Sequence, residues 1–578
     1  MLFSVTIPHT QVWTWPTLGE PAVLPSWLFR ALLWPFWRAG GLTGLFAWRW
    51  LTTFAAFALA WLTARRMWAK GLSPLAVLVI AALVYRQRSQ VRPETLAAVL
   101  LTLTLWLLER RRQVAAGTPD ASWALVAVAW VWANAHISYL LLFVLLGIHL
   151  LDALAAARRG QPRAHGSAGL LWIGFACAAV SFLNPFGWRA LWQPFEFFLH
   201  WRDTAIFQGI GELRRLGWSG NETNGLFTML IAWPLLVLWR ARRAGLDLAE
   251  ALTCAAFTAY ALPSQRFVSV YALVAAPYLA RDLDAWVATR RWPRWSAAPA
   301  ARAGLAAIAC VALALPEWFR PDSPMRPGVG VDLTRYPAAA CDFMAAHDIR
   351  GHGFNQVRSG GYLLWRFWPD RGRLPFISIH PEDSPPEIRS LYAAVFTDPA
   401  RWPDLDGRYP FDYALLDRRQ YGSDRLYDHL DADTTWALVF ADDAALLYVR
   451  RDGALAATAG RLAYRVVPGG RQGLAALRAA WASDTALATR ARAELERQVT
   501  ESPACSGSLS LLADLAIAGG RPADARPLLE RALSIEPATP QAHQRLGLIA
   551  MFEQDAPRAI REFERERRVA GPSAALEV

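Results

Sequence analysis

An amide and an imidazole, Asn134 and His136, lie two residues apart inside an otherwise apolar stretch. That stretch reads WVWANAHISYLLLFVLLGIHL from residue 130 to residue 150. Taking such groups into hydrocarbon is costly, so a chain either places them at a membrane boundary or uses them. Either the two side chains bind a polar ligand, or Asn134 caps a helix end and His136 satisfies backbone groups in the turn.

The elements that must position these residues are apolar runs in the first half of the chain. The 578 residues are 54% hydrophobic and only 19% charged, which is too apolar and too long for one soluble core. Several runs approach the roughly 20 residues that a spanning helix needs. We therefore predict a polytopic α-helical membrane domain over 42–316. Its ten predicted spans are 42–63, 73–85, 93–109, 122–135, 137–157, 167–183, 224–239, 248–262, 267–284 and 300–316.

Arginine clusters lie at one end of the predicted spans, for example Arg110 to Arg112 and Arg240 to Arg243. With ten spans all these clusters fall on one side, as the positive-inside rule requires of the cytoplasmic face. Topology therefore explains the excess of 60 Lys and Arg over 48 Asp and Glu, and we exclude a nucleic-acid partner. The same topology exports residues 1–41 and everything after 316.

Polar residues on the outward side of this topology are candidates for a site. Arg92 and Arg266 lie at outer span ends, and Glu212 and Arg214 lie in the outer loop 184–223, where ALWQPFEFFLHW predicts a helix in the membrane plane. Glu20 is the only acid of residues 1–41. Each also has an ordinary interpretation, as a surface carboxylate or as an arginine that snorkels to the interface.

The outside N-terminus lacks a signal-peptide pattern, which indicates that a first span is missing before residues 1–41. We expect residues 1–41 to be an outer loop or an amphipathic segment. After the membrane domain, a Pro-rich linker over 317–335 leads to a soluble part. Residues 336–452 alternate helix and strand and predict a small exported α/β domain. Its expected strands are HGFNQV, RLPFISI, FDYALLDR and a closing hairpin in WALVFADDAALLYVRR.

The last segment, 466–578, is helical and repeated. Two copies align at a period of 34 residues, with a looser helical unit before them near 472–498. The aligned pairs are Leu512 with Leu546, Ala513 with Gly547, Ala516 with Ala550, Ala525 with Ala559, and Leu529 with Phe563. This period resembles the tetratricopeptide repeat, which predicts an α-solenoid. Such an array binds a protein partner or acts as a stabilising cap.

The membrane half resembles the bacterial type C (GT-C) integral-membrane glycosyltransferase superfamily. In particular, the order of its elements and the character of its segments resemble members related to protein mannosyltransferases and to the lipid A aminoarabinose transferase. The resembling stretches are IPHTQVWTW, SWLFRALLWPFWRAGGLTGL, VRPETLAAVLLTLTLWLLERRR, WANAHISYLLLFVLLG, FLNPFGWRALWQPFEF and IGELRRLGW. In the exported part, SGGYLLWRFWPDRGRLPFISI resembles the Gly-Gly-Tyr-Leu segment of these proteins. The resemblance covers most of residues 6–450.

The resemblance implies sugar transfer from a polyprenyl phosphate to a glycan, lipid or protein acceptor on the outer face of the bacterial inner membrane. The reaction asks for a carboxylate that deprotonates the acceptor or holds a divalent metal, and for cations that stabilise the departing phosphate. The expected catalytic carboxylates are Glu20 and Glu212. The metal requirement is left open. The expected substrate-binding residues are Arg92, Asn134, His136, Arg214 and Arg266.

A second hypothesis comes from a departure from the family pattern. The acidic residue of the family follows the first span, and that part of the pattern would lie before Met1. This departure favours a non-catalytic relative that keeps the fold as a membrane anchor for an exported repeat scaffold. Arg92, His136 and Glu212 favour the enzyme.

Overall fold

The computed structural model describes residues 7–115, 117–161, 163–318, 330–419 and 424–570. The chain divides into two compact units, and the division does not follow the chain order. The first unit holds Met1–His9 and Ala22–Gly330, and the second holds Thr10–Pro21 and Val331–Val578. The N-terminal segment Thr10–Pro21 therefore belongs with the C-terminal half of the chain. Residues 319–329 of the predicted linker lie outside the described residues.

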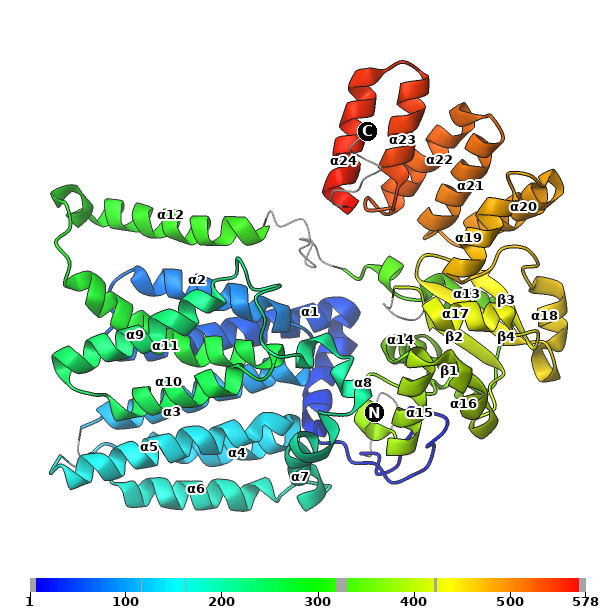
Figure 1. Ribbon diagram of the computed structural model, residues 1–578. Helices are drawn as coiled ribbons and strands as arrows, with labels where there is room; N and C mark the ends of the chain where they lie inside the picture. The colour runs from blue at the N-terminus through cyan, green and yellow to red at the C-terminus, as the bar shows by residue number, and fades with distance from the viewer. Residues whose placement is uncertain (1–6, 116, 162, 319–329, 420–423, 571–578) are drawn as a thin grey trace. The chain divides into compact units, whose positions relative to one another are not determined.

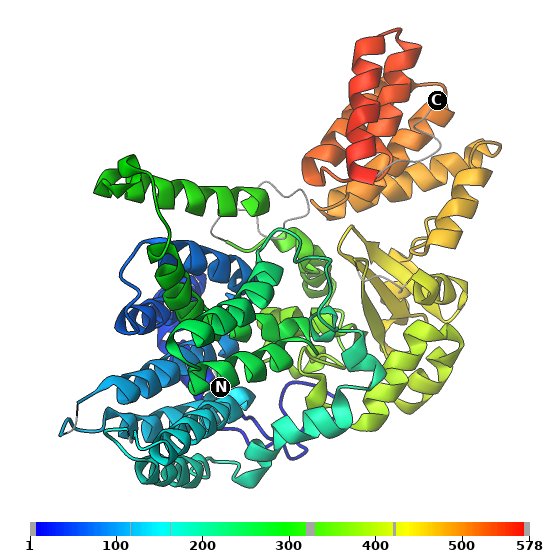
Figure 2. The same cartoon turned by 60° about the vertical axis from the view of Figure 1, so that its left-hand side comes forward.

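Long helices packed side by side make up most of the first unit (Figures 1 and 2). Two short helices and a π-helical turn, Phe197–Trp201, lie between α6 and α9. The helices are α1 (Trp27–Arg66), α2 (Ser73–Tyr85), α3 (Pro93–Gln113), α4 (Ala124–Ala135), α5 (Leu140–Arg158), α6 (Ser167–Ser181), α7 (Trp188–Glu196), α8 (Ala205–Gln208), α9 (Leu226–Ala244), α10 (Leu248–Ala261), α11 (Val268–Ala288) and α12 (Pro299–Trp318).

Each of the ten predicted spans overlaps one of the helices α1 to α6 and α9 to α12, while the number that crosses a membrane stays a prediction. The boundaries were predictable because the apolar runs end at arginine clusters or at Gly and Pro residues, which interrupt helices. Among the described residues, three helices are long and apolar enough to cross a membrane by length and composition alone. These are Trp27–Arg66, Ile137–Arg158 and Pro299–Glu317.

The second half of the predicted outer segment 1–41 is helical in the structure. The chain is already helical from Trp27, and α1 contains a kink at Gly41, where φ is 52° and ψ is −128°. A positive φ is readily adopted only by glycine, so Gly41 allows the helix to change direction at this point. The kink falls one residue before the predicted start of the span.

Helix α11 lies at the centre of the first unit. Its side chains from residue 268 to residue 282 are almost all buried, and Ala272, Ala275 and Ala276 are fully enclosed. Small residues let neighbouring helix backbones approach closely, which is the usual way in which helices pack inside membranes. In α12, by contrast, none of the apolar 18-residue window is buried.

The second unit contains a four-stranded sheet with the order β1-β2-β4-β3. Strand β1 runs parallel to β2, whereas β2 with β4 and β4 with β3 are antiparallel. The hairpin of β3 and β4 matches the predicted closing hairpin. The elements are α13 (Ala338–Ala346), β1 (Gly353–Asn355), α14 (Val357–Phe367), α15 (Pro386–Thr397), α16 (Trp402–Arg408), β2 (Tyr413–Asp417), α17 (Asp424–Ala432), β3 (Trp436–Ala441), β4 (Ala445–Arg450) and α18 (Ala456–Leu462).

The segment RLPFISI, predicted as a strand, is not one. The side chain of Asn355 takes the place of a neighbouring strand, because its Oδ1 accepts from Phe376 N (2.7 Å) and its Nδ2 donates to Ile377 O (2.9 Å). Pro375 in the same segment has no N–H to contribute to a ladder. Phe376 and Ile377 are fully buried, so the apolar pattern marked a core segment and not a strand.

Part of the N-terminal segment packs on the sheet of the second unit. The indole of Trp15 stacks on the imidazole of His352, with ring centroids 4.1 Å apart and an angle of 4° between the planes. Its Nε1 donates to Gly353 O at 3.0 Å, and its backbone N donates to Pro375 O at 3.1 Å. Residues 10–21 are therefore an integral part of the α/β fold, which the sequence did not indicate.

Six helices follow the α/β part (orange to red in Figure 1), and among them α21 packs against α22 and α23 against α24. In the last pair, a Cβ atom at Gly547 would lie 2.6 Å from the ring of Phe563, so the small residue makes room for the large one. The equivalent residues of the preceding pair, Ala513 and Leu529, belong to one buried cluster. The helices are α19 (Arg471–Ala480), α20 (Thr485–Glu501), α21 (Ser506–Ala518), α22 (Pro522–Ile535), α23 (Ala542–Phe552) and α24 (Ala556–Ala570).

Candidate functional site

A cavity of about 50 Å³ lies in the first unit, where α4 and α10 end and α3 and α11 begin. Its walls combine apolar side chains with a small number of converging polar groups, which is the usual character of a ligand pocket. The apolar lining includes Leu101, Trp132, Leu141 and Leu273. The polar lining includes Arg88, Glu94, His136, Ser138, Arg266 and Ser269.

Three arginines beside this cavity surround one carboxylate, that of Glu212. Arg88 Nη1 lies 2.5 Å from Glu212 Oε2, Arg92 Nη1 lies 3.3 Å from the same oxygen, and Arg266 Nη1 lies 3.7 Å from Oε1. The three arginines come from the turn after α2, the N-cap of α3 and the turn before α11. We call the three arginines the arginine cluster.

A second carboxylate, that of Glu94, pairs with Arg266 from the cavity side. Arg266 Nη2 donates to Glu94 Oε1 at 2.5 Å. Glu94 lies in the first turn of α3 directly after Pro93, a position that suits both residues, since the proline needs no hydrogen-bond partner and the carboxylate faces the positive helix end. Three guanidinium groups against two carboxylates leave this region with one net positive charge, which favours an anionic ligand.

The pKa of Glu212 lies below its ordinary value. Burial alone would raise it, but the guanidinium groups of Arg88, Arg266 and Arg92 outweigh the effect of burial. Glu212 is therefore ionised at neutral pH and is a weak base.

His136 has two roles in the structure. Its Nδ1 accepts from the backbone N of Ser138 at 3.2 Å and lies 2.6 Å from Ser138 Oγ, so the ring caps the short turn before α5. Because Nδ1 accepts, the neutral ring carries its proton on Nε2. Loss of solvation lowers the pKa of His136 to about 4, although Glu94 opposes this shift. His136 is thus a neutral hydrogen-bonding group of the cavity wall at pH 7.

Asn134 does not line the cavity. The side chain is fully buried and joins three parts of the first unit: Oδ1 accepts from Trp27 Nε1 at 2.8 Å, and Nδ2 donates to Trp130 O at 2.9 Å and to Leu183 O at 3.2 Å. These contacts satisfy the amide inside the protein. They explain Asn134 as a residue that holds helix ends together.

The other expected site residues are dispersed. Arg92 lies at the arginine cluster but is not part of the cavity lining. The side chain of Arg214 is exposed, while its carbonyl accepts from Gln265 N at 2.8 Å. Glu20 is exposed in the segment Thr10–Pro21 of the second unit.

The residues around the cavity do not fit a divalent metal. Both carboxylates, Glu94 and Glu212, are already paired with arginines. Across the described part of the chain, no group of three His, Cys, Asp or Glu side chains could hold a metal ion.

Arg88 and Glu94 are the residues that sequence reasoning missed. Both lie in RQRSQVRPE, the stretch from which Arg92 alone was singled out. The signal was present, since Arg88 and Glu94 flank Arg92 at the same predicted span end. Arg88 and Glu94 are recognised as site residues only by their contacts, Arg88 with Glu212 and Glu94 with Arg266. Each contact joins residues more than a hundred positions apart in the sequence.

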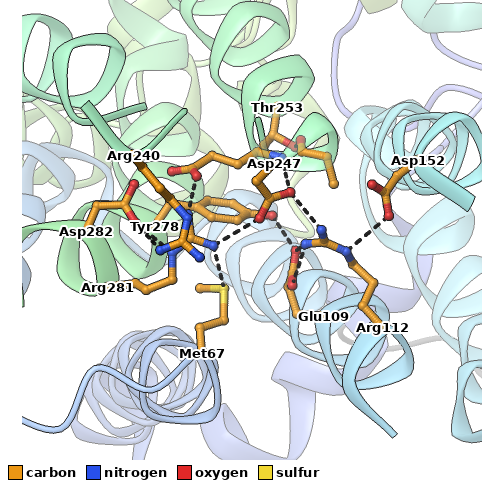
Figure 3. Close-up of polar contacts among 12 residues, drawn as sticks. Met67, Glu109, Arg112, Asp152, Arg240, Asp247, Thr253, Tyr278, Arg281 and Asp282 are labelled. Carbon is orange, nitrogen blue, oxygen red and sulfur yellow. Dashed lines mark hydrogen bonds and ion pairs between the residues drawn. The ribbon is translucent and has the colours of Figure 1, made fainter. Parts of the chain in front are cut away.

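A second polar cluster lies at the opposite ends of the helices, where α3 and α11 end and α10 begins (Figure 3). Arg281, whose side chain is 7% exposed, donates from Nε to Asp282 Oδ1 at 2.7 Å and from Nη1 to Asp247 Oδ2 at 3.1 Å, and it also pairs with Glu250. Arg112 donates to Glu109 and to Asp247 at 2.9 and 2.7 Å. Asp247 thus bridges the two buried arginines.

We call this second cluster the inner cluster; it comprises Glu109, Arg112, Asp247, Glu250, Arg281 and Asp282. It corrects one part of the sequence interpretation. Arg112 was explained only as a flanking charge of the positive-inside pattern, but its side chain is 13% exposed and is enclosed by acids from three helices. Breaking a buried ion pair on one side is strongly destabilising, because it leaves an uncompensated charge. The inner cluster therefore ties together the helices that carry the cavity at their other ends.

Comparisons with known proteins give structural matches only, since no protein-family model and no curated protein sequence matches this chain. The archaeal oligosaccharyltransferase AglB from Archaeoglobus fulgidus, solved with an inhibitory peptide and a dolichol-phosphate, is similar with a TM-score of 0.50. The identity is 12% over 77% of this chain and 67% of that chain. An A. fulgidus oligosaccharyltransferase tethered by a disulfide to an acceptor peptide containing the NVT sequon gives a TM-score of 0.47, at 12% identity over 75% of this chain and 66% of that chain. AglB has the GT-C fold, so a fold of this kind is confirmed, while the ten spans and the repeat solenoid stay predictions.

Proposed function

We propose that this chain is a membrane glycosyltransferase that takes a sugar from a polyprenyl-phosphate donor. The transfer takes place on the outer face of a bacterial inner membrane, where the second unit is exported. The observation that carries this proposal is the convergence of Arg88, Arg92 and Arg266 beside a cavity in a protein of GT-C fold. A planar guanidinium group can donate two parallel hydrogen bonds to the oxygens of one phosphate, and a partly buried setting strengthens each contact.

The position of the arginine cluster suits a lipid-linked ligand. The cluster lies at helix ends, so a phosphate held there would leave a polyprenyl tail beside the apolar helices of the first unit. Helix α7 and the following turn lie in the loop that also carries Glu212. Their aromatic side chains Trp192, Phe195 and Phe198 are exposed and provide an apolar surface there. AglB was solved with a dolichol-phosphate, which is a ligand of the same chemical class.

The acceptor is a protein, a glycan or a lipid. A protein acceptor is supported by the likeness to AglB, which was solved with an inhibitory peptide. The repeat helices of the second unit are then the part that recruits a protein, as tetratricopeptide-like arrays do.

Arg88, Arg92 and Arg266 would stabilise the charge that develops on the phosphate as the sugar leaves. His136, neutral at pH 7, would donate a hydrogen bond from Nε2 within the cavity. Glu212 remains a proposed carboxylate for deprotonating the acceptor, although its arginine partners make it a weak base. The catalytic role of Glu20, which belongs to the second unit, stays a prediction from the sequence.

The second candidate is a non-catalytic membrane anchor for the repeat scaffold. One observation favours it: both carboxylates beside the cavity, Glu94 and Glu212, are engaged by arginines. An anchor would retain the ion pairs for stability and would have no use for a general base.

Release of polyprenyl phosphate tests the proposal without knowledge of the acceptor. The full chain in lipid nanodiscs is given a panel of polyprenyl-phosphate sugars together with a membrane extract as the acceptor source. We expect release from at least one donor, and we expect Arg266→Ala to abolish it. If the wild-type chain releases polyprenyl phosphate from none of the donors, the anchor becomes the better account.

A further inference from the structure

We propose that the carboxylate of Glu212 occupies the arginine cluster in place of a ligand's phosphate, so that a phosphate ligand must displace this side chain in order to bind. The inference rests on the proposed function, because it takes a phosphate ester as the ligand. It adds a role in controlling access to the catalytic role proposed for Glu212.

The first argument is that both anions need the same donors. The Nη1 atoms of Arg88 and Arg92 lie 2.5 and 3.3 Å from Glu212 Oε2, and Nη1 of Arg266 lies 3.7 Å from Oε1. A phosphate group offers its oxygens to guanidinium groups in the same way as a carboxylate does. Two anions held among the same three cations would lie within a few ångströms of each other and would repel strongly in a partly buried site. Binding is therefore an exchange.

The second argument is that Glu212 can move without its loop. Ser264 Oγ donates to the carbonyl of Glu212 at 3.1 Å, and Gln265 N donates to the carbonyl of Arg214 at 2.8 Å. These bonds fix the backbone of the loop against the turn that carries Arg266. The side chain itself is 26% exposed, so rotation about its own bonds is enough to move the carboxylate into solvent.

The third argument concerns the free-energy cost of leaving the three arginines without an anionic partner. The side chain of Arg88 is only 10% exposed, and a guanidinium at that depth is unfavourable without an anionic partner. Glu212 supplies this partner in the absence of ligand, and a phosphate supplies it afterwards. The carboxylate therefore stabilises the unoccupied site and at the same time weakens the binding of every ligand that must replace it.

The test measures binding of a polyprenyl monophosphate to the full chain in nanodiscs. Glu212→Gln removes the charge but keeps the length of the side chain, and it should bind the probe about tenfold more tightly or better, the scale of one charge-assisted hydrogen bond. Asp203→Asn is the matched control, because it removes one negative charge from the same outer loop at a side chain that is 77% exposed. The control should bind like the wild type.

A second variant and a second readout protect the test against misfolding. Glu212→Asp keeps the charge but cannot reach all three arginines, so its affinity should lie between those of the wild type and Glu212→Gln. Modification of Arg88, Arg92 and Arg266 by phenylglyoxal, mapped by mass spectrometry, should increase in both variants and fall when the probe is added.

The outcomes separate the two proposals. If the wild type binds the probe and neither Glu212 variant binds it more tightly, displacement of Glu212 is overturned while the phosphate site stands. If no variant binds the probe, both the phosphate site and the displacement are overturned. If Glu212→Gln binds a probe that the wild type does not, displacement is supported directly.

Discussion

Arg266 Nη2 donates to Glu94 Oε1 at 2.5 Å, and this contact joins two helix starts that are 172 residues apart in the sequence. The same guanidinium faces Glu212 through its other terminal nitrogen. Arg266 is therefore the one residue of the arginine cluster that contacts both carboxylates, and it links the cluster to the cavity.

Replacing Arg266 should weaken binding of polyprenyl monophosphate. We expect Arg266→Ala to cost about 1.5–3 kcal/mol, the range for hydrogen bonds to charged groups. Arg266→Lys should recover only part of this loss, because an ammonium group cannot bind in the two-pronged way of a guanidinium. The exposed Arg189 of α7 provides the control, and Arg189→Ala should leave the affinity unchanged. Equal effects of Arg189→Ala and Arg266→Ala would mean that only general charge matters.

The inner cluster should be essential for stability and not for ligand affinity. Arg281→Met leaves Asp282, Asp247 and Glu250 without a shared cation, and such a loss costs about 3–5 kcal/mol in buried pairs. Thermal unfolding in detergent measures the effect. Arg290→Met, an exposed change just after α11, is the control. A second change that removes an acid, Glu250→Gln, should restore part of the stability in the double variant, and no restoration would argue against charge balance as the cause.

Asp442 predicts a pH-dependent stability of the second unit. Burial raises the pKa of this carboxyl to about 6 from an ordinary value of 3.8, although backbone N–H groups and Ser502 oppose the shift. The raised pKa means that the folded state disfavours the charged form. The unfavourable contribution is thus absent below pH 4, grows between pH 4 and 6, and is complete above pH 6.

Asp442→Asn removes this charge and keeps the two backbone hydrogen bonds, since Oδ1 still accepts from Ala444 N and Ala445 N. The bond with Ser502 has to reverse its direction, because the amide nitrogen of Asn donates where Oδ2 of Asp442 accepts. We expect the variant to be more stable than the wild type by about 1–3 kcal/mol at pH 7 and equal to it at pH 4. Unfolding at several pH values measures this difference. Asp452→Asn, at a side chain that is 76% exposed, should show no such trend. A stability gain of Asp442→Asn that does not change with pH would contradict the assignment.

The repeat alignment predicts a paired rescue. Gly547→Ala places a Cβ atom 2.6 Å from the ring of Phe563 and should destabilise the last helix pair by about 1–3 kcal/mol through overpacking. Phe563→Leu in addition recreates the pair Ala513 and Leu529 of the preceding repeat, and the double variant should regain most of the loss. Additive losses in the double variant would show that the two repeats are not equivalent at these positions.

Local patterns in the sequence predicted the helices well, because apolar length and flanking arginines determine where a buried helix starts and stops. The same reasoning failed where a side chain replaced a backbone partner. Asn355 satisfies the segment around Phe376 in place of a strand, and nothing local to that segment indicates it.

Sequence patterns also could not predict the long-range ion pairs. A pattern can place Arg92 and Arg266 at helix ends, but it cannot show that Arg88 lies 2.5 Å from Glu212, 124 residues away. Gly360 is an intermediate case. The sequence resemblance singled out the Gly-Gly-Tyr-Leu segment but gave no reason for its first glycine. In the structure, a Cβ atom at Gly360 would lie 2.3 Å from the carbonyl oxygen of Ile377. Only the fold reveals that close approach.

The most direct test of the central claim compares two lipids that differ only in their head group. Binding of polyprenyl monophosphate and of the uncharged polyprenol of the same chain length is measured on the wild-type chain in nanodiscs. We predict that the phosphate binds at least about a hundredfold more tightly, since two or more charged contacts are made to it alone. This preference should disappear in the double variant Arg88→Ala with Arg266→Ala. Equal binding of the two lipids by the wild type would contradict a phosphate site at the arginine cluster, and with it the proposed transferase.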